Sequence, residues 1–248
     1  MFTPQAATRA VPRVSIRSWL RKRYRGPWPP VGWVRFGGLR RTRPISQVFG
    51  FDRGLPIDRH YIESFLQAHC QDVRGRVLEV ADSDYTVRFG GDRVLRSDVL
   101  DLTPTPRSTI VADLQVPDSL PADTFDCIIL TQVLQLIYDI RTAIRNSYRA
   151  LKPGGVLLVT LPGICRICRD EEGRWGDCWR LTGRAARLLF EEQFPAGSVS
   201  VATYGNVLAA TGFLYGLAVA ELKRDELDAQ DPDFELVVSV RAVKPGTS

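Results

Sequence analysis

Apolar residues in this chain gather in short continuous runs, and between the runs apolar and charged positions alternate at helical spacing. Residues 125–130 and 151–160 contain two such runs, rich in Ile, Val and Leu. Apolar runs of this length are typical of strands buried on both faces of a parallel sheet. Residues 140–151 carry apolar side chains on one helical face and arginines on the other. The order strand, helix, strand predicts an α/β protein.

Three further apolar runs predict strands at residues 76–80, 93–99 and 109–112. Nineteen positions separate Glu79 from Asp98, and fifteen separate Asp98 from Asp113. A crossover between parallel strands needs about a dozen residues or more. The first crossover is therefore expected to be brief, and the second to lack a full helix.

Two helices are expected to flank these strands. One covers residues 58–70, ahead of the first strand. The other begins near Thr182, after the fifth strand, with Ala185, Leu188 and Leu189 facing inward. Both spacings predict helices that pack against the sheet.

The strand that begins Phe125-Asp126 and the turn Leu151-Lys152-Pro153-Gly154-Gly155 resemble the fourth and fifth strands of class I S-adenosylmethionine (SAM) dependent methyltransferases, particularly the small-molecule type 11 group. The resemblance runs from about Gly75 to Lys244. It implies a Rossmann-like fold, with a mostly parallel central sheet and helices on both faces. It also implies SAM as cofactor and SN2 transfer of its methyl group.

The resemblance assigns the methionine end of the cofactor to the turn after the first strand. Glu79 matches the acidic residue with which that strand ends in the family. Family members continue with a glycine-rich turn, because glycine adopts positive φ and lets the backbone approach a ligand. This chain has Ala81 and Asp82 there instead. The loop is therefore a degenerate form of the glycine-rich turn. It is still expected to bind SAM, and the affinity for SAM is the property that the missing glycines affect.

The resemblance places the adenosine end of SAM against the next strands. Asp98 matches the ribose-binding position, with Asp101 as a rival. Asp113, followed by Leu114, matches the residue that accepts from the adenine amino group. Gln132, just past the fourth strand, is expected to face the cofactor or the acceptor. The alternative for these positions is a turn or a helix cap, where Asp is common.

The segment after the fifth strand commonly builds the acceptor pocket in this family. Trp175 and Trp179 are expected to form an apolar or sugar-stacking wall, Asp177 to act as base towards an acceptor hydroxyl, and Arg180 to hold an anionic group. The alternative is that the tryptophans close the core and that Asp177 pairs with an arginine. Further acceptor contacts are expected from Tyr204 and Asn206.

The helix before the first strand often closes over the cofactor in the resembling family. His60 is therefore a second catalytic candidate, and Tyr61 a substrate-binding one. A surface position is the alternative for His60.

Charge is distributed unevenly along the chain. Residues 1–53 carry twelve Lys or Arg and one acid, a net of +11, whereas the remaining chain carries 21 basic and 27 acidic residues, a net of −6. Two domains are therefore expected: a basic arm with Trp and Pro at 1–53, and a methyltransferase-like domain at 54–248. The arm is expected to wrap the acidic body, or to bind an anionic membrane surface or a membrane-associated partner; nucleic acid is a weaker alternative.

The sequence also indicates where the protein is located and whether it binds a metal. The most apolar segment, residues 207–220, is shorter than the roughly twenty residues of a membrane span, and it predicts a buried helix. The N-terminus lacks the apolar core of a secretory signal, so a cytoplasmic protein with reduced cysteines is expected. Cys165, Cys168 and Cys178 lack the fourth ligand of a structural zinc site, and no metal is expected.

The function expected from the sequence is O-methylation of a sugar or other polar small molecule. RNA methylation through the basic arm is the enzymatic alternative. A non-catalytic, methyltransferase-like module that binds a partner is the alternative from another class, suggested by the missing glycines.

Overall fold

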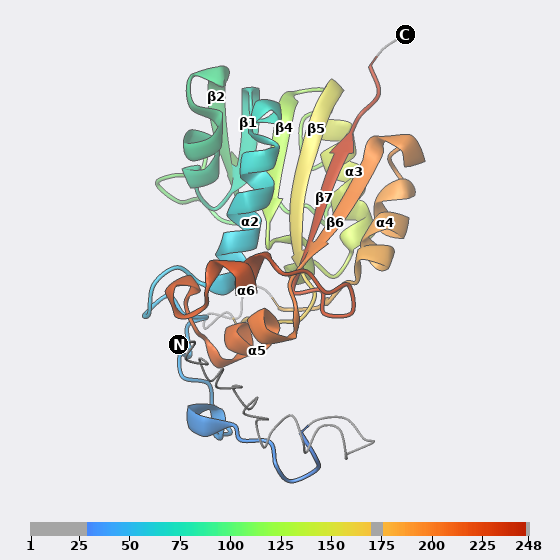
Figure 1. Ribbon diagram of the computed structural model, residues 1–248. Coiled ribbons are helices and arrows are strands. Elements are labelled where there is room, and N and C mark those ends of the chain that lie inside the picture. Colours follow the sequence, from blue (N-terminus) through green and yellow to red (C-terminus); the bar gives the residue numbers. More distant parts are fainter. Residues whose placement is uncertain (1–28, 170–175, 247–248) are drawn as a thin grey trace, which may run out of the picture. The chain divides into compact units, whose positions relative to one another are not determined.

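A computed structural model of the chain describes residues 29–169 and 176–246, and its main element is a seven-stranded sheet (Figure 1). The strand order is β3-β2-β1-β4-β5-β7-β6. The strands are β1 (Gly75–Val80), β2 (Val94–Asp101), β3 (Ile110–Val111), β4 (Phe125–Thr131), β5 (Leu151–Pro162), β6 (Val199–Tyr204) and β7 (Val237–Val243). The α-helices of the described residues are α2 (Ile57–Ala68), α3 (Ile140–Ala150), α4 (Gly183–Glu191), α5 (Val207–Tyr215) and α6 (Arg224–Asp228).

Strands β1 to β5 pair in parallel, and β7 runs antiparallel to both β5 and β6. This strand order and direction form the Rossmann-like, mostly parallel sheet that the resemblance predicted. The order reverses at β1, from which the chain passes outwards to β2 and β3 and then returns to β4 on the other side. In open parallel sheets, ligands bind at the carboxyl ends of the strands beside such a reversal.

Helices cover both faces of the sheet (Figure 1). On one face, Ile144 of α3 and Phe190 of α4 share a core cluster with Leu78, Ile128 and Leu157 of the strands. On the other, α2 and α5 share a cluster with the alternating strand residues, which include Val77, Ile129 and Leu158. Because side chains alternate between the faces of a strand, a strand covered on both faces is apolar throughout, which explains the continuous apolar runs.

The early crossovers are short, as the spacing predicted. The first consists of a π-type turn at Thr86–Gly90 and a 3-10 turn at Gly91–Arg93, and the second has no helix among its described residues, 102–109. Strand β2 ends at Asp101 rather than Val99, two residues later than expected. In α4, Leu188 is 56% exposed, and Ala186 and Phe190 face the core instead.

The chain divides into two compact units, Met1–Thr42 and Arg43–Ser248. The division falls eleven residues before position 53, because residues 45–53 are held by the second unit. The amides of Ile45 and Ser46 both donate to the carbonyl of Tyr215, at 2.8 and 3.2 Å. Ser46 is 1% exposed, and Arg53 forms an ion pair with Glu221. None of the described helices is both long and apolar enough to cross a bilayer.

Candidate functional site

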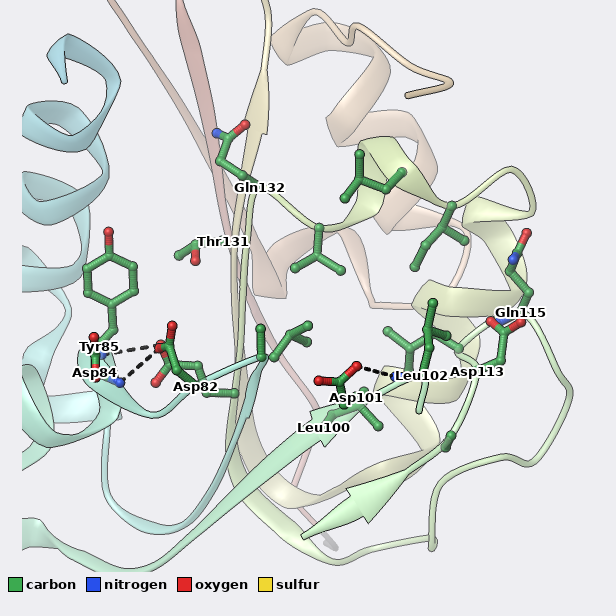
Figure 2. Close-up of a pocket in the computed structure, with 18 of the residues that line it drawn as sticks. Asp82, Asp84, Tyr85, Leu100, Asp101, Leu102, Asp113, Gln115, Thr131 and Gln132 are labelled. Carbon is green, nitrogen blue, oxygen red and sulfur yellow. Dashed lines mark hydrogen bonds between the residues drawn. The ribbon is translucent and has the colours of Figure 1, made fainter. Parts of the chain in front are cut away.

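A cavity of about 1,200 Å³ lies at the carboxyl ends of β1, β2 and β4, where the strand order reverses. Figure 2 shows its polar side chains in a row, from Tyr85 and Asp84 at one end, past Asp82 and Asp101, to Asp113 and Gln115 at the other. Each of these strands contributes residues from its last positions and from the segment that follows it. Those residues include Glu79, Ala81, Asp82, Asp84 and Tyr85 from β1, Asp101 and Leu102 from β2, Ala112, Asp113, Leu114 and Gln115 from β3, and Thr131, Gln132 and Val133 from β4.

Glu79 fixes the turn that follows β1. Its carboxylate accepts hydrogen bonds from the amide of Tyr85 at 3.2 Å, and from the amide and hydroxyl of Thr86, both at 2.7 Å. Burial raises the pKa of Glu79 to about 7, although the hydrogen bonds from Thr86 and Tyr85 oppose that rise. Ala81 adopts a φ of 71° inside this turn, in the left-handed region that glycine enters without strain. Both Glu79 and Ala81 line the cavity.

Asp98 lies outside the cavity and is a structural residue of β2. It is fully buried, and its carboxylate contacts Arg76 Nε at 2.6 Å, Arg96 Nη2 at 3.2 Å and the Thr109 hydroxyl at 3.1 Å. Burial disfavours ionisation of Asp98, but the contacts with Arg76, Thr109 and Arg96 together outweigh it, and the pKa of Asp98 is lowered. Asp101, the last residue of β2, lines the cavity instead. Asp101, the alternative to Asp98, thus occupies the strand end at which the resemblance places the ribose-binding acid.

Asp113, Leu114 and Gln132 all line the cavity, as does Asp82. One carboxylate oxygen of Asp113 accepts from the Gln115 amide at 2.8 Å. Gln132 has a φ of 56°, and its amide donates to the carbonyl of Thr160 at 2.9 Å. This contact ties the residue after β4 to the end of β5.

The segment after β5 reaches the cavity through Gly176 and Cys178. The Cys178 amide donates to the Gln135 carbonyl at 2.8 Å. Trp179 stacks on the cavity-lining Tyr138 with ring centroids 6.0 Å apart, and its indole N–H donates to the Ile137 carbonyl at 2.9 Å. Trp179 therefore supports the wall from behind. Trp175 lies outside the described residues.

Asp177 and Arg180 form a buried ion pair that does not line the cavity. Arg180 donates from Nη1 and Nη2 to the two carboxylate oxygens of Asp177, at 2.5 and 2.6 Å, and the Cys168 amide donates to Asp177 at 2.6 Å. The Asp177 side chain is 1% exposed. Burial opposes its ionisation, yet the bonds from Arg180 and Cys168 lower the pKa of Asp177 overall. The geometry is that of a loop clamp, which was the alternative for this pair.

His60, Tyr61, Tyr204 and Asn206 form a second cluster, also outside the cavity lining. Tyr61 stacks on Tyr204 at 5.9 Å, and its hydroxyl donates to the carbonyl of Leu227 in α6. The Asn206 side chain caps the N-terminus of α5, and its Nδ2 donates to the carbonyls of Glu226 and Ala229, in and just after α6. His60 Nε2 lies 3.7 Å from Asp228. These four residues hold α6 against α2 and α5.

The cavity face of α2 carries Arg59 and Glu63 instead, one helical turn apart, together with Phe51 and Leu55 ahead of the helix. Their spacing of four residues is a signal that the sequence does contain. It was missed because a helix turns by about 100° per residue, so a one-residue error in phase moves the expected face onto His60 and Tyr61. The sequence also did not predict that Tyr85 and Arg88 line the cavity, because a turn without glycines has no sequence motif that marks it as a binding site.

Residues 64–159 match the family model of the type 11 methyltransferases, described as a methyltransferase domain. The matched segment runs from α2 to β5 and supplies most of the residues that line the cavity. Residues 64–159 therefore form a SAM-dependent methyltransferase domain. The domain is an enzyme of the transferase class, and SAM is its cofactor.

Solved structures similar to this methyltransferase show low sequence identity. A SAM-dependent methyltransferase from Mesorhizobium loti is 17% identical, with 76% of this chain and 100% of that chain covered and a TM-score of 0.48. The N-methyltransferase NodS from Bradyrhizobium japonicum is 19% identical, with 78% and 90% covered and a TM-score of 0.45. The [4+2]-cyclase SpnF is 16% identical, with 73% and 82% covered and a TM-score of 0.45. No curated protein matches this chain.

The residues of the cavity fit SAM chemically. Leu102, Ala112 and Leu114 give the cavity an apolar surface near Asp101 and Asp113. An apolar surface suits an adenine ring, and the two acids suit the ribose hydroxyls and the adenine amino group. The acids near β1 suit the positive sulfonium and ammonium groups of SAM. Within the described residues no cluster of His, Cys, Asp and Glu has the arrangement of a metal site.

Proposed function

We propose that this methyltransferase acts on a polar small molecule, and that a hydroxyl group of a sugar or similar compound is the acceptor. The observation that carries this proposal is the size and lining of the cavity. Ligand pockets for one small molecule measure about 300–1,000 Å³, and this cavity of about 1,200 Å³ exceeds that range. Beyond the residues that suit SAM it continues to Leu55, Tyr138 and Cys178, which leaves room for a second small molecule.

In the proposed arrangement Asp101 binds the ribose hydroxyls and Asp113 accepts from the adenine amino group. Glu79 holds the turn after β1 in shape. SAM supplies the activated methyl group when it is bound. The chain's own contribution is to hold the acceptor oxygen in line with that group and to exclude water from it, because positioning alone removes much of the barrier of a bimolecular reaction.

Neither candidate for a catalytic base, Asp177 or His60, lines the cavity. Asp177 is engaged by Arg180, and His60 faces Asp228 rather than the cavity. The proposed mechanism therefore does not depend on either residue as base.

We propose a separate role for the basic arm, association with an anionic membrane surface. Its described part exposes Val31, Trp33 and Phe36, which are 97%, 59% and 55% exposed, beside Arg35 and Arg40. Aromatic side chains favour the membrane interface, and each basic residue adds attraction to anionic lipid.

Titration calorimetry with SAM on three variants tests the cofactor arrangement. Asp101→Asn and Asp113→Asn should each weaken binding by about 1–3 kcal/mol, the cost of losing a hydrogen bond to a charged group. Asp98→Asn is the matched control, and it should lower the free energy of unfolding while the folded fraction keeps its affinity.

Loss of affinity in Asp98→Asn alone would contradict the assignment of the ribose site to Asp101. An unaltered protein that fails to bind SAM would contradict the proposed function as a whole. A screen of sugar and polyol acceptors with methyl-labelled SAM then tests the acceptor class, and labelling of RNA but of no small molecule would overturn it.

A further inference from the structure

The cavity has an unbalanced set of charges. Six carboxylates line it: Glu63, Glu79, Asp82, Asp84, Asp101 and Asp113. Two basic side chains line it, Arg59 and Arg88, and no others among the described residues do. A cavity of this kind attracts cations and repels a free anion. SAM nevertheless brings one carboxylate with it, at the end of its methionine chain, and that group needs a positive partner.

Arg88 already has a partner. Its guanidinium contacts both carboxylate oxygens of Glu63, at 2.7 and 2.8 Å. Arg59 has no such neighbour, since no described carboxylate lies within 4.0 Å of its guanidinium. The Arg59 guanidinium lies over the ring of Phe51, 5.8 Å from the centroid, and its charge opposes the rise that burial causes in the pKa of Tyr85. It is thus a half-buried arginine on the wall of the cavity, held by a ring and without an ion-pair partner among the described carboxylates.

Arg59 also lies at the correct end of the cavity. The adenosine-binding acids Asp101 and Asp113 stand towards one end, and Tyr85 stands at the opposite end (Figure 2). A cofactor whose adenine lies against Asp113 must extend its amino-acid chain towards Tyr85. Arg59 lies one helical turn from Glu63, whose carboxylate pairs with Arg88, three residues after Tyr85. Arg59 therefore lines the cavity towards the Tyr85 end.

We propose that Arg59 binds the α-carboxylate of the cofactor and thereby replaces the missing glycine-rich turn. A glycine turn brings backbone N–H groups close to a ligand. In this chain Ala81 carries a Cβ at a φ of 71°, and the Tyr85 and Thr86 amides already donate to Glu79. The carboxylates of Asp82 and Asp84 repel a ligand carboxylate further. An arginine opposite the turn supplies the bidentate donor that the turn lacks, while the acids remain for the ligand ammonium group. This inference rests on SAM being the cofactor.

Two ligands separate the role of Arg59 from that of the rest of the cavity. S-adenosylhomocysteine carries the amino-acid chain without the sulfonium charge, and 5′-methylthioadenosine lacks that chain altogether. Binding of both is measured by calorimetry on the full chain and on Arg59→Gln. The control is Arg53→Gln, which also removes one positive charge but does not line the cavity. Arg59→Gln should weaken S-adenosylhomocysteine about 10- to 100-fold, as expected for a lost charge-assisted contact, and leave methylthioadenosine within twofold. Arg53→Gln should change neither affinity more than about twofold.

Three results would overturn the proposal. One is unchanged S-adenosylhomocysteine affinity in Arg59→Gln, which would leave this arginine to an anionic acceptor. Another is an equal loss for both ligands, which would mean a disturbed cavity. The third is an equal loss in Arg53→Gln, which would mean a general electrostatic effect. If the unaltered chain binds neither ligand, the proposed function itself fails, and thermal unfolding of each variant identifies any that does not fold. Arg59→Lys should regain part of the affinity, since lysine keeps the charge but loses the bidentate geometry.

Discussion

At the scale of single residues, the buried carboxyl of Glu79 makes stability depend on pH. Its pKa is raised from 4.5 to about 7 in the folded chain, so the folded protein holds the proton more tightly than the unfolded one. The resulting stabilisation is fully present below about pH 4.5 and is lost as the pH rises through 7. A shift of this size corresponds to about 3 kcal/mol.

The prediction is measured by urea unfolding at pH 5.5 and pH 8. The unaltered chain should lose roughly 2 kcal/mol more of its free energy of unfolding between these pH values than Glu79→Gln does. Other titrating groups are common to both proteins and cancel in the comparison. Identical pH profiles would mean that Glu79 titrates near its ordinary pKa.

The residues at strand ends were predictable because the family pattern fixes them along the chain. Ala81, Asp82, Asp113 and Gln132 follow apolar runs and line the cavity, and their contacts with the cofactor stay predictions. Asp98 was not placed correctly, because the apolar residues Val99 and Leu100 continue the strand beyond it. Its partner Arg76 lies on β1, and a contact across strands leaves no local trace in the sequence.

At the scale of elements, the segment between β5 and α4 depends on the Asp177–Arg180 pair. Breaking a buried ion pair leaves a buried charge unpaired, which costs about 3–5 kcal/mol. Because Arg180 is 24% exposed, we expect a smaller loss of about 2 kcal/mol for Asp177→Asn. Affinity for S-adenosylhomocysteine should stay unchanged, since the pair does not line the cavity.

Chemical denaturation with a matched control checks this expectation. Asp228→Asn removes the ion pair with Arg224, whose side chains are 51% and 75% exposed, and exposed pairs contribute about 0–1 kcal/mol. If Asp177→Asn keeps full stability yet abolishes methyl transfer, Asp177 acts as the base that the sequence suggested.

The elements themselves were largely predictable, and their orientation was less so. Apolar runs and the Pro-Gly-Gly turn define β4, α3 and β5. In α4 the pattern placed Leu188 inward, whereas Phe190 fills the core and Leu188 is exposed. A nine-residue helix rich in Leu, Ala and Arg has two plausible apolar faces, and only the shape of the facing sheet selects one.

At the scale of the whole molecule, the division at residue 42 predicts that residues 1–42 can be removed and that the second unit needs residues 43–53. Deleting residues 1–42 should leave the melting temperature and S-adenosylhomocysteine affinity unchanged. Association with phosphatidylserine vesicles, if the arm mediates it, should disappear, and in the full chain it should weaken with salt. Vesicle co-sedimentation measures this directly, and equal binding by both forms would contradict the membrane role.

A second truncation tests the boundary. Deleting residues 1–53 also removes Ser46, the Phe49 ring that lies 6.2 Å from that of Phe213, and the Arg53–Glu221 ion pair. We expect a loss of about 1–3 kcal/mol in the free energy of unfolding from these buried contacts. An equally stable shorter form would return the boundary to residue 53.

The position of β7 in the sheet has a consequence for synthesis of the protein on the ribosome. Strand β6 pairs with β7, and one edge of β5 also pairs with β7. The ribosome synthesises residues 163–236 after β5 and before β7. Until β7 is made, one edge of β5 is therefore unpaired, and β6 has no strand to pair with. Unpaired edges of apolar strands invite association between chains. The nascent chain is therefore most exposed to misassembly, and most dependent on chaperones, until residue 243 has left the exit tunnel.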